Sequence, residues 1–189
     1  MSTTSPLVLG RATLADLAKT PGKAELVGGR IVHLMPTGLR PNLVAGRIYR
    51  SLADHVDAIV RGVALTDNMG FAVPELPSGR ESFSPDVAYY SGPSSADDMR
   101  FIQGPPTFAV EVRSENDYGP AAERAMAAKR ADYFTAGTLS VWDVDSIALC
   151  VHAYRADAPD QPTTFLRGQE ADAEPAVPGW RIAVDRIFP

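Results

Sequence analysis

PTFAVEVRSENDYGPAAERAMAAKRADYFTAGTLSVWDV, residues 106–144, is the stretch that decides the fold. It opens with a run of apolar and β-branched residues at 107–112, which is typical of a buried strand. A helix follows, because Pro120 is favoured at a first helical position and Gly137 at a helix end. Another apolar run covers 139–144. The stretch therefore predicts a strand, a helix and a strand in that order.

The flanking sequence extends this pattern in both directions. Thr13 precedes a short capped helix, and Gly28-Gly29 separates two apolar runs that predict an opening β-hairpin. Apolar residues at helical spacing predict a long helix from Pro41 to Gly62. Further strands are expected at 69–73, 86–90 and 147–154, then a solvated loop with edge strands at 155–174 and a short docked element at 179–188. The order indicates an α/β or α+β fold, with a mixed central sheet flanked by helices.

Composition limits the class of protein. The chain has 189 residues, of which 45% are hydrophobic and 22% charged, as in a globular protein, so one domain over 1–189 is expected. The single cysteine, Cys150, excludes an internal disulfide and a CxxC zinc site. Without a long apolar segment, or a basic flank leading into an apolar run at the start, we expect a cytoplasmic protein with no membrane association. The net charge of -5 argues against coating nucleic acid by bulk electrostatics.

Two carboxylates occupy unusual places. Asp86 follows Pro85 at the start of DVAYY, and Glu111 lies within FAVEV. A charged side chain in such a run costs several kcal/mol of desolvation unless it is paired, protonated or bound to a cation. If the two strands are neighbours, both carboxylates can hold one magnesium ion. The alternative, acids at strand ends that face water or pair with arginine, stays open.

Positive charge is distributed unevenly. Only Lys19, Lys23 and Lys129 are lysines among 18 basic residues. Lys129 lies in the alanine-rich helix, whose small residues allow close approach to the sheet, so its ammonium could lie over the carboxylates; a surface lysine is the simpler interpretation. Five arginines between Arg30 and Arg61 form either a contact for DNA phosphates beside the metal site or a solvated helix face.

The remaining motif search is negative. His33, His55 and His152 are too far apart for a zinc motif, and each reads as a surface or strand histidine. No Walker loop, G-x-G-x-x-G fingerprint or G-x-S-x-G elbow occurs in the sequence.

Six segments in register resemble the Uma-type (Uma-two) endonuclease family of the PD-(D/E)XK restriction-endonuclease-like superfamily. They are ELVGGRIV, SPDVAYY, PTFAVEVRS, KRADYFTAG, LSVWDVD and EPAVPGWRIAVDRIF, and they cover residues from about 24 to 188. The resemblance implies a restriction-endonuclease-like core with an N-terminal β-hairpin.

The resemblance also implies a site. Asp86 and Glu111 would bind Mg²⁺, with Mn²⁺ as a substitute, helped by the backbone carbonyl of Val112, and the metal would promote hydrolysis of DNA. The superfamily's lysine position holds Arg113 here, which stays charged and is a poor proton shuttle, so we expect Lys129, in K-x-x-x-Y, to aid the attacking water. Glu25 matches the family's first acid and would complete the site from the opening hairpin; the alternative, a solvent-facing strand residue, stays open. A homodimer is a further expectation.

The sequence departs from the family at several points. Gly28 and Arg30 stand where further hairpin acids are common, a histidine before the long helix is missing, and Ser114-Glu115 replaces serine-proline. These departures keep open an alternative, a catalytically inactive nuclease-fold module that binds nucleic acid or a protein partner.

Overall fold

The computed structural model describes residues 10–93 and 99–189. The start of the chain was expected to lack a basic flank leading into an apolar run, and most of that stretch lies outside these ranges. In chain order the elements are α1 (Leu14–Leu17), β1 (Ala24–Val27), β2 (Arg30–His33), α2 (Leu39–Ile59), β3 (Val63–Thr66), β4 (Phe71–Ala72), β5 (Ser82–Phe83), β6 (Val87–Tyr90), β7 (Ile102–Gln103), β8 (Phe108–Val112), α3 (Pro120–Ala136), β9 (Ser140–Asp145), β10 (Cys150–Arg155), β11 (Ala158–Phe165), β12 (Glu170–Asp172), β13 (Arg181–Ala183) and α4 (Val184–Ile187).

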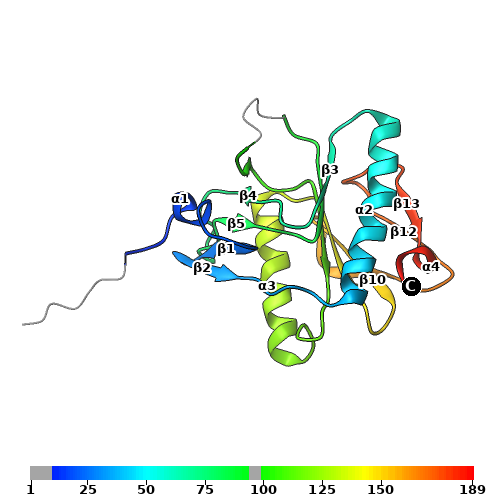
Figure 1. The fold of residues 1–189 in the computed structure, drawn as a ribbon. Coiled ribbons are helices and arrows are strands. Elements are labelled where there is room, and N and C mark those ends of the chain that lie inside the picture. Colours follow the sequence, from blue (N-terminus) through cyan, green and yellow to red (C-terminus); the bar gives the residue numbers. More distant parts are fainter. Residues whose placement is uncertain (1–9, 94–98) are drawn as a thin grey trace, which may run out of the picture.

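A six-stranded mixed sheet forms the centre, in the order β11-β10-β9-β8-β6-β3. Only β8 and β9 run parallel, joined by α3, and the other neighbours are antiparallel. Figure 1 shows α2 and α3 on opposite sides of this sheet. The expected mixed sheet flanked by helices is therefore confirmed, as is the opening hairpin, β1-β2.

The two helices attach to the sheet by different means. Val44, Ile48, Leu52 and Val56 recur every four residues on α2, and all four are buried in the apolar core on its side. On α3 the buried residues are only Asp132 and Tyr133. We expected the alanines of this helix to allow its close approach to the sheet, but those at 121, 125 and 128 are exposed. Polar side chains therefore make much of the contact between α3 and the sheet.

Strand β3 is missing from the sequence prediction. It has four residues, none of them fully buried, and lies at the sheet edge, so its apolar signal is short and weak. At the opposite edge, the expected edge strand in the acidic tail is confirmed as β11, which carries Pro159 and Pro162. Proline is tolerated there because an edge strand needs fewer ladder hydrogen bonds.

The strand register creates a line of polar residues across the sheet, which we call the polar row. Its members are Asp67, Asp86, Glu111, Asp143, His152 and Thr164. Glu111 pairs with Asp143, Asp143 with His152 and His152 with Thr164. Asp67 and Asp86 come next to the pairs Thr66–Val87 and Val87–Val110 and so continue the line.

The polar row faces α3. Val110 and Val112 belong to the core on the α2 side, whereas Ala109 packs with Tyr133 on the α3 side. Because side chains alternate along a strand, Glu111 faces α3 as Ala109 does. Among the described helices, none is long and apolar enough to cross a membrane.

Candidate active site

Asp86 lies immediately before β6, at the level of Glu111 in the neighbouring strand β8. The backbone N–H of Asp86 donates to the Val110 carbonyl at 3.0 Å, which fixes the start of β6 against β8. In return, Oδ2 of Asp86 accepts the Val112 N–H at 2.8 Å. The register thus brings the two predicted acids to one place beneath α3.

Lys129 reaches the carboxylates from α3. Its Nζ lies 2.8 Å from Oε1 of Glu111 and 3.0 Å from Oε1 of Glu25. One helical turn later, the hydroxyl of Tyr133 donates to the same Glu111 oxygen at 2.6 Å. Sequence and structure therefore place Lys129 and Tyr133 on the helix face that covers Glu111.

Glu25 is the most deeply buried of these acids, with 3% of its surface exposed. Its Oε2 accepts from Arg80, which also donates to Asp132 of α3 at 2.9 Å, and its Oε1 accepts the Ser84 N–H at 2.9 Å. These contacts join the β1-β2 hairpin to α3 and to the segment before β6. The structure brings Glu25 next to Lys129, but with both of its oxygens already engaged.

A second lysine, which sequence reasoning did not assign to the site, lies at Asp86. Nζ of Lys23 is 2.7 Å from Oδ1 of Asp86 and 2.5 Å from Oδ1 of Asp67. Lysine is rare in this sequence, and two of its three lysines contact these carboxylates. This rarity is the only signal in the sequence that points to Lys23. Its partners are distant in sequence and follow only from the fold.

The ionisable groups influence one another strongly. Burial raises the pKa of Glu111; the Lys129 ammonium opposes burial, and the charges of Asp86 and Glu25 add to it. Burial would also raise the pKa of Glu25, but Lys129 and Arg80 outweigh it, so that pKa is lowered. Burial works to lower the pKa of Lys129, yet the charges of Glu111 and Glu25 raise it above its usual value. Lys129 is therefore a fixed positive charge.

The carboxylate oxygens of this site meet some, but not all, of the requirements for binding a hard divalent cation. In the described ranges, no group of three or more His, Cys, Asp or Glu residues is arranged to hold a metal ion. Two carboxylates are present, however, and Oε2 of Glu111 accepts no hydrogen bond from any described residue. The Glu111 side chain is 25% exposed, which leaves access from solvent. Two carboxylates with retained waters are compatible with Mg²⁺, which binds few protein oxygens.

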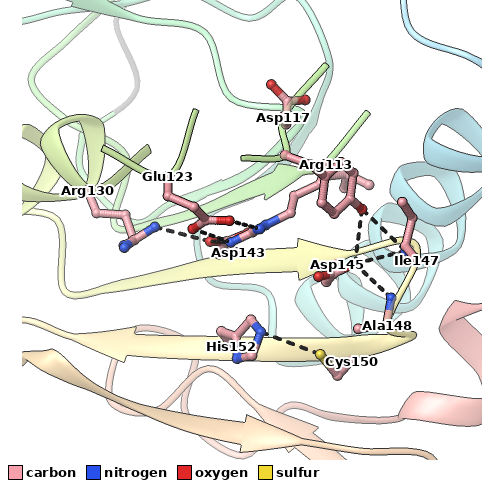
Figure 2. A network of polar contacts seen from close by, with 12 residues as sticks. Arg113, Asp117, Glu123, Arg130, Asp143, Asp145, Ile147, Ala148, Cys150 and His152 are labelled. Atoms are coloured by element: carbon pink, nitrogen blue, oxygen red, sulfur yellow. Dashed lines mark hydrogen bonds and ion pairs between the residues drawn. The ribbon is translucent and has the colours of Figure 1, made fainter. Parts of the chain in front are cut away.

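Arg113 lies on the same face of the sheet but belongs to a separate network (Figure 2). It donates to both oxygens of Asp143, at 2.7 and 2.8 Å, and to both oxygens of Glu123. Arg130 adds a contact to Asp143 at 3.1 Å. We call Arg113, Glu123, Arg130 and Asp143 the arginine cluster. Arg113 makes no hydrogen bond or ion pair with Glu111 or Asp86 among the described contacts.

The arginines of α2 are separated from the carboxylates. Arg47 and Arg50 line a hollow of about 410 Å³ together with Arg186 of α4. This hollow lies on the α2 side of the sheet, because α2 buries its apolar face there and contacts α4. Of the two alternatives for the arginines between Arg30 and Arg61, Arg47 and Arg50 therefore fit the helix face and not a DNA contact beside the carboxylates.

Two of the histidines lie within hydrogen-bond distance of neighbouring groups of the fold. His152 lies 3.5 Å from Sγ of Cys150, a contact drawn in Figure 2. It also lies 2.9 Å from the Thr164 hydroxyl. His55 contacts the Pro178 carbonyl.

Comparisons with known proteins agree with this architecture. A family model described as "Uma2: Putative restriction endonuclease" matches residues 12–185. Among solved structures, the chain is similar to the crystal structure of a nuclease of DUF820, termed putative, from Anabaena variabilis ATCC 29413, with a TM-score of 0.71 and 17% sequence identity. That match covers 93% of this chain and 97% of the other. A search of curated proteins gives no match.

The family match spans most of the chain, and the mixed sheet between helices is that of a restriction-endonuclease-like fold. The chain belongs to the Uma2 family of restriction-endonuclease-like proteins.

Proposed function

We propose that this chain is a metal-dependent endonuclease that hydrolyses phosphodiester bonds of DNA. Mg²⁺ or Mn²⁺ would be held by Asp86, Glu111 and the backbone carbonyl of Val112. The observation that carries the proposal is the contact of Lys129 with Glu111 at 2.8 Å, beside Asp86 just before the neighbouring strand. Membership of a nuclease family supports the reaction class.

A bound divalent ion would lower the pKa of a water ligand and neutralise charge on the scissile phosphate. The chain's own residues stabilise the developing charge and hold one another in position. Lys129, held protonated, donates to the attacking water or to the phosphate oxygens and offsets charge as the phosphorus becomes pentacovalent. Tyr133 fixes one oxygen of Glu111, so the other oxygen would be available to hold the ion. Glu25 holds the Lys129 ammonium in place.

Substitution of the two acids tests the proposal. Glu111→Gln and Asp86→Asn should each abolish Mg²⁺-stimulated cleavage of a DNA duplex and remove Mg²⁺ binding measured by calorimetry. Glu115→Gln is the matched control, because Glu115 is exposed four residues further along the same segment. Circular dichroism should show that all three variants fold. Undiminished cleavage by both Glu111→Gln and Asp86→Asn would refute the proposal.

One observation favours a second function, an inactive nuclease-fold module. Asp86, Glu111 and Glu25 each already have a cationic partner within the described structure. Such a module would bind no Mg²⁺ in calorimetry and cleave no DNA with any divalent ion, while it retained DNA or a protein partner.

A further inference from the structure

Lys23 is the second lysine at the carboxylates, and the proposed function does not use it. It lies just before β1, and its side chain is only 16% exposed. Its ammonium bridges Oδ1 of Asp86 and Oδ1 of Asp67. Lys19, four residues earlier, is by contrast exposed. A lysine with so little exposure, held between two acids, requires an explanation.

The contacts of Asp86 restrict where a metal ion can bind. Oδ2 of Asp86 accepts the Val112 N–H at 2.8 Å, and Oδ1 accepts from Lys23 at 2.7 Å. A divalent ion bound by Asp86 beside Glu111 has to share an oxygen with one of these donors. The backbone donor is fixed by β8, whereas the lysine ammonium is a point charge on a flexible stem. The ammonium is therefore the donor that can yield its place to the ion.

Asp67 provides an alternative partner for the displaced ammonium. Its side chain is 52% exposed, and it lies beside Asp86 at the end of β3. Lys23 can thus leave Asp86 without becoming an unpaired charge. In that position its ammonium is paired with a half-exposed acid, where solvent and a substrate phosphate can reach it.

We propose that Lys23 sets the cation affinity of the carboxylate site and binds the substrate. Its ammonium competes with the divalent ion for Oδ1 of Asp86 and, once displaced, contacts a phosphate of the substrate. This inference rests on the metal assignment made under the proposed function. It predicts that removal of the ammonium changes metal affinity and nucleic-acid affinity in opposite directions, because the two ligands have opposite charges.

Calorimetry with Mg²⁺ alone gives the first readout. Lys23→Gln keeps a polar stem without the charge, and it should bind Mg²⁺ about tenfold more tightly than wild type, since a like charge close to the ion is removed. Lys23→Arg keeps the charge and should bind Mg²⁺ no more tightly than wild type. Lys19→Gln, the matched control at an exposed lysine, should also bind Mg²⁺ as wild type does. Lys23→Ala provides a second neutral variant, with folding followed by circular dichroism.

Retention of a short DNA duplex gives the second readout, with Ca²⁺ in place of Mg²⁺ to slow cleavage. Lys23→Gln should bind the duplex several-fold more weakly, with a smaller salt dependence, because one phosphate contact is lost. Tighter Mg²⁺ binding with weaker DNA binding supports the proposal. Mg²⁺ affinity that is unchanged or lower in both neutral variants overturns it, and unchanged DNA affinity overturns the phosphate contact. If wild type and every variant fail to bind Mg²⁺, the proposed function itself fails.

Discussion

The polar row divides into two halves that treat similar acids differently. In one half, lysines contact Asp86 and Glu111 through single ammonium groups, and one Glu111 oxygen accepts no bond from the described residues. In the other half, Asp143 is 2% exposed, and both of its oxygens are occupied by arginine. A guanidinium matches a carboxylate through two parallel hydrogen bonds, whereas an ammonium is a single movable charge. The acids paired with lysine can therefore exchange partners, whereas the acid paired with arginine holds the sheet to α3.

The largest expected effect lies in the arginine cluster. Asp143→Asn removes the buried charged partner of the Arg113 guanidinium and leaves it only the half-exposed Glu123 carboxylate, so the free energy of unfolding should fall by about 3 kcal/mol. Urea denaturation measures this change. Glu123→Gln is the control: the Glu123 side chain is 48% exposed, and its loss should cost less than about 1 kcal/mol. If folded Asp143→Asn loses DNA cleavage at low temperature, the two halves are not functionally separate.

Removal of Lys129 tests the lysine half. Lys129→Met should lower the rate of DNA cleavage by about 100-fold, as loss of one fixed group that stabilises developing charge does. The comparison is between single-turnover rates of wild type and variant at saturating Mg²⁺. Arg124→Met, at an exposed arginine of the same helix, should cleave normally. A Lys129→Met enzyme as fast as wild type would remove Lys129 from the proposed chemistry.

A smaller, pH-dependent effect is expected next to the arginine cluster. Burial would raise the pKa of Asp145, but N–H donors of Ala148 and Ile147 outweigh it and lower that pKa (Figure 2). The stabilisation is therefore present above the unfolded-state pKa and is lost as pH falls through the folded-state pKa. Asp145→Asn should cost about 1 kcal/mol at pH 7, and the difference from wild type should shrink in acid. Urea denaturation at a series of pH values from 7 to about 3 follows this loss; a difference independent of pH would contradict it.

Strand periodicity could predict where Glu111 lies but not what it contacts. FAVEV indicates a buried strand, and the helix from Pro120 to Gly137 is visible in its end residues. The contact between Lys23 and Asp86 joins residues 63 positions apart, and it depends on how the hairpin packs against the sheet. The attachment of α3 through Asp132 and Arg80 is equally non-local. Local patterns do not encode such pairings.

The prolines of β11 limit how copies of this chain can associate. An exposed edge strand ordinarily offers its free N–H and C=O groups to a strand of another molecule. Pro159 and Pro162 each lack an N–H, so the β11 edge is a poor template for extending the six-stranded sheet into a second copy. Self-association by continuous sheet formation is therefore disfavoured at this edge, and a dimer would have to use another surface of the chain.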